Sequence, residues 1–198
     1  CFERVAAGLA KQAGKAEISK ALEDQGLVVL YSVPWPPQGI YFKKDVASTD
    51  DMAGVKVRSY NNSTGRISEL SGMVPVQLEA SEITQGLITG VIESLITSAV
   101  TGQDSKAWEQ LTHFYKVNAW QPRNFVLVNK DAWDGLDDAT RKVFTDCAAS
   151  AETNGVKMSK EANDKALATL AGKGMKVLAP SDKLASQLRA IGETMVSD

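Results

Sequence analysis

Residues 53–64 read Ala-Gly-Val-Lys-Val-Arg-Ser-Tyr-Asn-Asn-Ser-Thr, and this segment indicates how the chain folds. Apolar and polar side chains alternate over positions 55–60, which predicts a strand with Lys56, Arg58 and Tyr60 on one face. The polar residues from Asn61 onward predict that a helix begins where the strand ends. The segment is therefore expected to form one strand–helix unit of an α/β sheet.

The same alternation of strands and helices continues on both sides of this unit. Strands are predicted over residues 27–33, 40–46, 55–60, 74–78, 91–95, 114–120, 124–128 and 175–178, and helices over 2–25, 61–70, 81–87, from Asp137 to about Leu170, and after Pro180. This order predicts the α/β fold class. The continuous apolar run at 27–33 is typical of a strand buried on both faces of a parallel sheet. Within the long helix, Cys147 recurs with apolar residues at helical spacing, which predicts a buried thiol.

Composition argues against several classes of protein. Of 198 residues, 43% are hydrophobic and 23% are charged, as in ordinary globular domains. The formal net charge is -2 and the basic residues do not cluster, which argues against nucleic-acid binding. The longest apolar runs fall far below the roughly 18 residues that a membrane-spanning helix needs. With two cysteines and one histidine, we expect no metal site and no cofactor.

The sequence motifs of common enzymes are missing. The chain contains no GxSxG, HExxH, GxxxxGK[ST] or GxGxxG. Their absence favours a binding protein, and leaves a small α/β enzyme that acts on a carboxylate as the alternative. A third possibility is an interaction module in which Trp35 and Trp120 pack against a partner chain.

Two residues are candidate ligand contacts from the pattern alone. Arg58 falls near the carboxyl end of its strand, the edge at which open α/β sheets collect ligands, and its guanidinium could hold a carboxylate through two parallel hydrogen bonds. The plainer interpretation is a surface arginine on an edge strand. Trp35 stands between Pro34 and Pro36 on a stiff loop, where it could stack on a planar ligand or pack between domains.

Four blocks in a fixed order carry a resemblance to a known family. They read AGVKVR at 53–58, LSGMVPV at 70–76, GLITGVIE at 86–93 and VNKDAWDGL at 128–136. Together they resemble the DctP family, the extracytoplasmic solute-binding proteins of TRAP (tripartite ATP-independent periplasmic) transporters. The resemblance covers nearly the whole chain.

The resemblance implies a periplasmic binding protein type II-like fold, in which two α/β lobes joined by a long helix close over a small organic acid. It implies a periplasmic protein without catalytic activity, whose signal peptide has been removed and which delivers the acid to the membrane permease subunits of the transporter. Arg58 then meets the ligand carboxylate across a water-filled gap between the lobes. The further contacts that the resemblance implies are Gln38, Asn61, Thr97 and Ser98, with Trp35 added from the pattern.

Departures from the family pattern bear on the ligand and on the lobes. Residues 93–98 replace the usual asparagine-containing run, and Ala80 leaves room where other members tend to carry phenylalanine. With the aromatic loop at 34–39, this favours a monocarboxylate with a flat or apolar body, such as an aromatic or branched 2-oxo acid. The chain opens within a later helix of the family pattern, so the first lobe is expected to be incomplete. Residues 1–35 and 122–162 would be its remnant, and residues 36–121 and 163–198 the second lobe.

Overall fold

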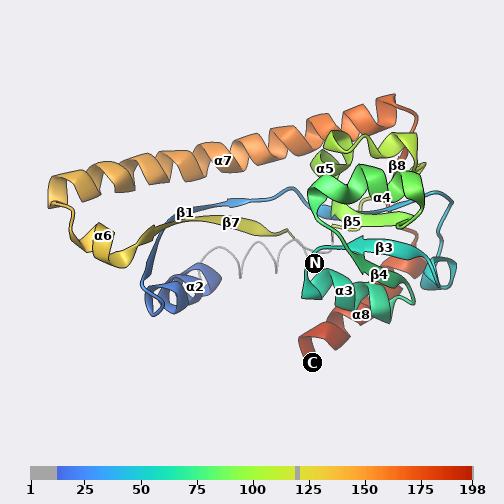
Figure 1. Cartoon of the computed structure of the whole chain (residues 1–198), viewed down its shortest axis with the longest axis horizontal. Coiled ribbons are helices and arrows are strands. Elements are labelled where there is room, and N and C mark those ends of the chain that lie inside the picture. Colours follow the sequence, from blue (N-terminus) through green and yellow to red (C-terminus); the bar gives the residue numbers. More distant parts are fainter. Residues whose placement is uncertain (1–12, 119–120, 198) are drawn as a thin grey trace. The chain divides into compact units, whose positions relative to one another are not determined.

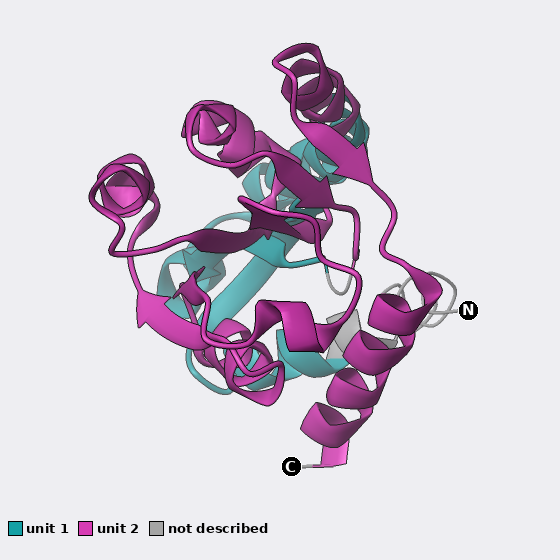
Figure 2. Ribbon diagram, turned by 90° about the vertical axis from the view of Figure 1, so that its right-hand side faces the viewer, with its two compact units in different colours: residues 1–35, 120–161 teal, residues 36–119, 162–198 magenta. Residues whose placement is uncertain are grey.

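The computed structural model describes residues 13–118 and 121–197. The chain divides into two compact units, each with its own sheet (Figures 1 and 2). Unit 1 comprises Cys1–Trp35 and Trp120–Glu161, and unit 2 comprises Pro36–Ala119 and Ala162–Asp198. Because strands and helices alternate along the chain, the predicted α/β class is confirmed.

Unit 2 contains a six-stranded mixed sheet with the strand order β4-β3-β5-β2-β6-β8. The strands are β2 (Gln38–Phe42), β3 (Lys56–Ser59), β4 (Val74–Gln77), β5 (Ser94–Ser98), β6 (His113–Tyr115) and β8 (Lys176–Leu178). Strand β3 runs parallel to both β4 and β5, whereas β2 runs antiparallel to β5 and β6. Strand β8 pairs in parallel with β6.

Helices cover this sheet and enclose the main core. They are α3 (Asn62–Leu70), α4 (Ile83–Thr89), α5 (Ala99–Asp104), α8 (Asp182–Ser197) and the last part of α7 (Asp138–Gly172), with 3-10 turns η1 (Thr49–Met52), η2 (Ala80–Glu82) and η3 (Ala107–Glu109). The core cluster joins Tyr41 and Phe114, whose ring centroids lie 4.4 Å apart, to Leu170 from α7. Removal of these large side chains from water supplies the main driving force for unit 2 to fold.

Polar caps fix where several helices begin. Asp137 accepts a hydrogen bond from the backbone N–H of Thr140 at 2.9 Å, so the predicted start of the long helix is confirmed. Ser181 caps α8 in the same way through the N–H of Leu184 at 3.1 Å. The predicted strand at 91–95 is misplaced by three residues, because Gly90 ends α4 in the left-handed region at φ 72° and the chain turns before β5 begins.

Unit 1 is built on a narrower sheet. Its elements are α2 (Ala13–Glu23), β1 (Leu27–Pro34), β7 (Arg123–Asn129), α6 (Lys130–Asp134) and the first part of α7. Strands β1 and β7 pair antiparallel, so the prediction of a parallel strand buried on both faces was wrong for residues 27–33. In the described part of the chain this sheet has two strands, and a two-stranded sheet covers little of its own apolar surface.

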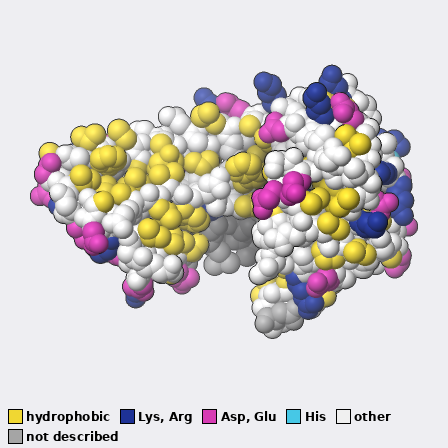
Figure 3. Space-filling model, viewed as in Figure 1, with side chains coloured by type: hydrophobic (Ala, Val, Ile, Leu, Met, Phe, Trp, Pro, Cys, Tyr) yellow, Lys and Arg dark blue, Asp and Glu magenta, His cyan; other side chains and the backbone are white. Residues whose placement is uncertain are grey.

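The narrow sheet explains a second wrong prediction, the burial of Cys147. Its thiol is free and exposed, and the neighbouring Val143 and Phe144 are 62% and 47% exposed. Ala148, one position further along α7, is buried at 5% exposure. In this part of α7 the face that carries Ala148 is therefore buried, and the neighbouring face that carries Cys147 is exposed. Figure 3 shows hydrophobic side chains gathered on the visible surface of unit 1.

Because Cys147 is exposed, we expect its thiol to react freely with a disulfide reagent. In a Cys1→Ser variant, the rate of labelling by DTNB should lie within about tenfold of the rate in denaturant, since the reagent reaches an exposed thiol about as easily in the folded chain as in the unfolded one. Stopped-flow absorbance measures both rates, and a Cys147→Ser variant gives the blank. Strong protection in the folded chain would contradict the exposed position of this side chain.

None of the helices in the described ranges combines the length and the apolar character that crossing a membrane requires.

The predicted helix at 2–25 is described only from Ala13 onward, and Trp120 lies outside the described residues. Helix α5, between β5 and β6, was not predicted, and β6 is shorter than the predicted strand at 114–120.

Candidate functional site

The topology of unit 2 brings four of the predicted contacts to one edge of the sheet. Strands β3 and β5 are parallel, so their carboxyl ends, with Arg58 and Thr97, lie at the same edge. Strand β2 is antiparallel to β5 and places its first residue there, because Gln38 pairs with Ser98. This is the edge at which open α/β sheets bind ligands.

Arg58 is buried without an acid to balance it. The residue is 5% exposed, and its Nε donates a hydrogen bond of 2.9 Å to the backbone oxygen of Leu78. Among the residues that the structure describes, no carboxylate lies within ion-pair distance of it and no other acceptor hydrogen-bonds to its guanidinium. Burial lowers the pKa of Arg58, yet an arginine stays protonated at neutral pH. The site therefore holds a cation whose two terminal nitrogens are left for an external partner.

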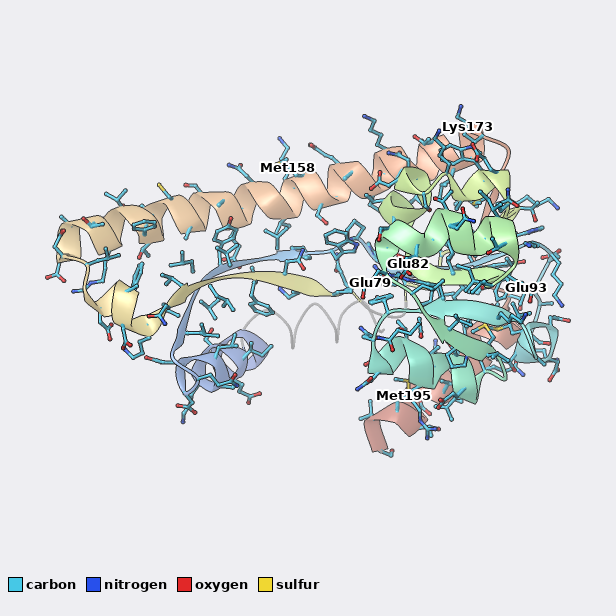
Figure 4. All side chains as sticks on the ribbon, viewed as in Figure 1. Glu79, Glu82, Glu93, Met158, Lys173 and Met195 are labelled. Carbon is cyan, nitrogen blue, oxygen red and sulfur yellow. The ribbon has the colours of Figure 1, made fainter. Side chains whose placement is uncertain are left out.

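One carboxylate lies in the wider neighbourhood. Glu79, just after β4, attracts the charge on Arg58 and thereby raises its pKa, against the larger effect of burial. Glu79 is exposed, and its backbone N–H donates to Oε2 of Glu82 at 2.8 Å, at the turn that leads into α4 (Figure 4). An exposed carboxylate beyond contact distance is screened by water and cannot replace a paired anion.

The side chain of Gln38 is held from two sides. It is 2% exposed; its Nε2 donates to the backbone oxygen of Pro36 at 2.9 Å, and its Oε1 accepts from the hydroxyl of Tyr60 at 3.2 Å. The ring of Tyr60 in turn lies against Arg58, with 4.6 Å between the guanidinium carbon and the ring centroid. Tyr60 was not singled out as a site residue, although the alternation of its strand had placed it on the face of Arg58.

Thr97 and Ser98 lie on opposite faces of the sheet. Arg58 pairs with Leu95, and Thr97 follows two positions later, so Thr97 shares the face of Arg58. Thr97 is 3% exposed, and its hydroxyl makes no hydrogen bond within the described part of the chain. Ser98 caps α5 instead, with its Oγ 3.2 Å from the N–H of Thr101. Of the two, Thr97 is the one available to a ligand of Arg58.

Asn61 and Trp35 have other local roles. The Oδ1 of Asn61 accepts from the backbone N–H of Thr64 at 2.8 Å and so caps α3, which leaves only its amide N–H groups for another partner. Trp35 belongs to unit 1, is 39% exposed, and its backbone N–H donates to the oxygen of Pro122 at 2.7 Å.

No other feature of the described residues competes as a site. A surface hollow of about 250 Å³ in unit 1, between α2, β1 and α6, contains none of the predicted contacts. Neither does a second hollow of about 370 Å³, which is lined by residues of α7 from Ala149 to Asn154. No group of three or more His, Cys, Asp or Glu side chains in the described ranges could hold a metal ion.

The family model of the bacterial extracellular solute-binding proteins, family 7 (DctP), matches residues 2–198. One curated relative is a monocarboxylate 2-oxoacid-binding periplasmic protein of Nostoc sp., which is 26% identical over 149 residues. That match covers 74% of this chain and 41% of the relative.

Solved structures agree with the family match. The chain is similar to DctP6 and DctP7 of Bordetella pertussis, extracytoplasmic solute receptors binding pyroglutamic acid, with identities of 42% and 38% and TM-scores of 0.93 and 0.92. Each match covers 98% of this chain and 64% of the receptor. A TRAP solute-binding protein from a marine metagenome, specific for pyroglutamate, is 41% identical with a TM-score of 0.90, over 100% of this chain and 64% of that one.

These comparisons confirm the predicted resemblance and fold type. They also show that the chain spans less than two thirds of the length of the solved relatives and about two fifths of the curated one. The relatives are solute-binding receptors, so the alternative of a small α/β enzyme gains no support from them.

Proposed function

The chain belongs to family 7 of the bacterial extracellular solute-binding proteins, and on that basis we propose that it is the part of a periplasmic receptor that captures a small organic acid by its carboxylate. The receptor would present the acid to the membrane permease of a TRAP transporter, without chemical change to the ligand. Unit 2 supplies the cationic contact of this site through Arg58.

The observation that carries the proposal is the unbalanced burial of Arg58. A charged group removed from water costs free energy unless an opposite charge and hydrogen bonds compensate it. Nε is already bonded to the backbone of Leu78, whereas the terminal nitrogens are not bonded within the described part of the chain. A ligand carboxylate can accept two parallel hydrogen bonds from a guanidinium and would supply the missing anion.

We propose pyroglutamate as the ligand. Three relatives of 38–42% identity bind pyroglutamate. Pyroglutamate has one carboxylate for Arg58 and a flat lactam that offers both a donor and an acceptor. The hydroxyl of Thr97, buried on the face of Arg58, has the polarity to pair with such a group.

The second candidate is a 2-oxo acid with an aromatic or branched body. It is favoured by the Nostoc relative, which binds monocarboxylate 2-oxoacids, and by the small Ala80, two residues after the Leu78 whose backbone oxygen accepts a bond from Arg58. A 2-oxo acid shares the carboxylate but offers no N–H donor. The two candidates thus differ in the polar group next to the carboxylate.

A binding series separates these candidates. Isothermal titration of the 198-residue chain with pyroglutamate, phenylpyruvate, 2-oxoisovalerate and succinate should give the tightest binding for pyroglutamate. Prolinamide, which keeps a five-membered ring but lacks the carboxylate, is the control and should not bind. Tighter binding of either 2-oxo acid would favour the second candidate, and preference for succinate or binding of none of the acids would contradict the proposal.

A further inference from the structure

Tyr60 touches two predicted ligand contacts that come from different strands. Its ring lies against the guanidinium of Arg58, and its hydroxyl donates to the Oε1 of Gln38. A cation placed over an aromatic ring is attracted by the negative face of that ring, and the attraction grows where water is excluded. Tyr60 therefore links β2 and β3 at the edge where the ligand is proposed to bind.

The orientation of Gln38 is fixed by its two hydrogen bonds. Its Nε2 donates to the oxygen of Pro36 at 2.9 Å, so its Oε1 must face the hydroxyl of Tyr60. With the side chain 2% exposed, little of the amide faces solvent, and each of its two ends already makes one hydrogen bond within the protein. Gln38 thus holds Tyr60 in place rather than presenting free polar atoms to solvent.

The guanidinium of Arg58 is likewise held in two ways. The bond from Nε to the backbone oxygen of Leu78 holds one edge, and the ring of Tyr60 packs against the guanidinium, with its centroid 4.6 Å from the central carbon. A guanidinium forms two parallel bonds to a carboxylate only when its plane and its free edge point in the right direction. Fixing them before the ligand arrives reduces the entropy that binding would otherwise cost.

We propose that Tyr60 is a positioning residue for Arg58, and that Gln38 acts on ligand affinity through Tyr60 instead of by direct contact. This inference rests on the proposed function, since it concerns how the same site holds a carboxylate. It adds Tyr60, which the sequence pattern did not identify as a site residue. It also gives Gln38, which the family resemblance implied as a ligand contact, an indirect role.

A double-mutant cycle tests the link between the two side chains. Tyr60→Phe keeps the ring but loses the hydroxyl, and it should weaken pyroglutamate binding by about 2- to 10-fold, the range for one lost hydrogen bond. Gln38→Ala removes the bond to Tyr60 and the bond to Pro36, so it should weaken binding at least as much. The double variant should bind no more weakly than Gln38→Ala alone, because that change already removes the hydrogen bond that Tyr60→Phe removes. Additive losses would mean that Gln38 contacts the ligand itself and would overturn the inference.

Removal of the ring tests the action through Arg58. Tyr60→Leu should weaken binding by about 5- to 30-fold, as expected for a desolvated cation–π contact, but should have no further effect in an Arg58→Ala background. A further loss in that background would place Tyr60 against the ligand and overturn the positioning role. Tyr115→Phe, which loses a buried hydroxyl bonded to Asp45 elsewhere in unit 2, is the control and should leave affinity unchanged.

A measurement without ligand separates this inference from the proposed function. In the ligand-free proteins, the N–H proton at Nε of Arg58 should exchange with water faster in Tyr60→Leu than in the parent chain, as measured by nuclear magnetic resonance. An unchanged exchange rate would overturn the positioning role even if pyroglutamate binds. Conversely, absence of acid binding with faster exchange in the variant would reject the proposed function and leave the contact between the two side chains established.

Discussion

Replacement of Arg58 by alanine is expected to weaken binding of pyroglutamate by about 2–5 kcal/mol, which is roughly 30-fold at the lower bound. The residue is buried at 5% exposure and its terminal nitrogens are not bonded to the described protein. The ligand carboxylate would then lose both its partner charge and two hydrogen bonds in a place that water reaches poorly. Isothermal titration or competition with a labelled acid measures the loss.

A lysine at the same position should rescue only part of the affinity. Its ammonium keeps the charge but has no planar pair of donors, so it cannot form the bidentate contact, and the ring of Tyr60 loses its flat partner. Binding by Arg58→Lys should therefore lie between that of the parent and that of the alanine variant. The order parent, lysine, alanine separates the contribution of charge from that of geometry.

The matched control for both variants is Arg66→Ala. Arg66 lies on α3 of the same unit, with its side chain 45% exposed and 3.7 Å from Glu69. Loss of an exposed ion pair has little effect on the free energy of unfolding. Because Arg66 is not among the proposed ligand contacts, its removal should leave affinity within about twofold of the parent. Equal losses for Arg58→Ala and Arg66→Ala would show that general electrostatics, and not a specific clamp, governs anion binding.

Local signals in the sequence predicted elements of both units. The alternation over 55–60 gave β3 and placed Arg58 and Tyr60 on one face, and these two side chains are in contact. Asp137 marked the start of α7 because its carboxylate can accept from the N–H three residues later, as it does. Strand alternation and helix capping depend only on residues close in sequence, so predictions from them hold in any tertiary arrangement.

Predictions that depended on distant neighbours were less successful. Whether Cys147 is buried depends on how wide the sheet beneath α7 is, and the periodicity of the helix contains no information about that width. The link between Gln38 and Tyr60 requires β2 and β3 to lie on either side of β5, an order that does not follow the sequence. The placement of Arg58 and Tyr60 on one face of a single strand was thus predictable, whereas the contact of Tyr60 with Gln38 on another strand was not.

Substitution of Gly39 by alanine is expected to destabilise unit 2 by about 3 kcal/mol or more, the upper part of the range for overpacked cores. Gly39 lies in β2, between two paired strands, and pairs with Thr97. An added Cβ would come within 2.4 Å of the Phe114 ring and 2.5 Å of the backbone oxygen of Tyr115. The ring is packed in the core and the backbone oxygen belongs to the sheet, so neither can move aside cheaply.

Urea denaturation followed by circular dichroism measures this loss, with Gly65→Ala as the matched control. Gly65 lies inside α3, where an added Cβ would meet no atom within 4 Å, and alanine in a helix is favoured over glycine by about 0.5–1 kcal/mol. The control should therefore be neutral or stabilising, while Gly39→Ala shifts the midpoint of unfolding to a lower urea concentration.

Because Gly39 follows Gln38 directly, any folded Gly39→Ala protein should also bind acid more weakly. A stable variant with unchanged affinity would mean that β2 tolerates displacement at the edge where Gln38 holds Tyr60.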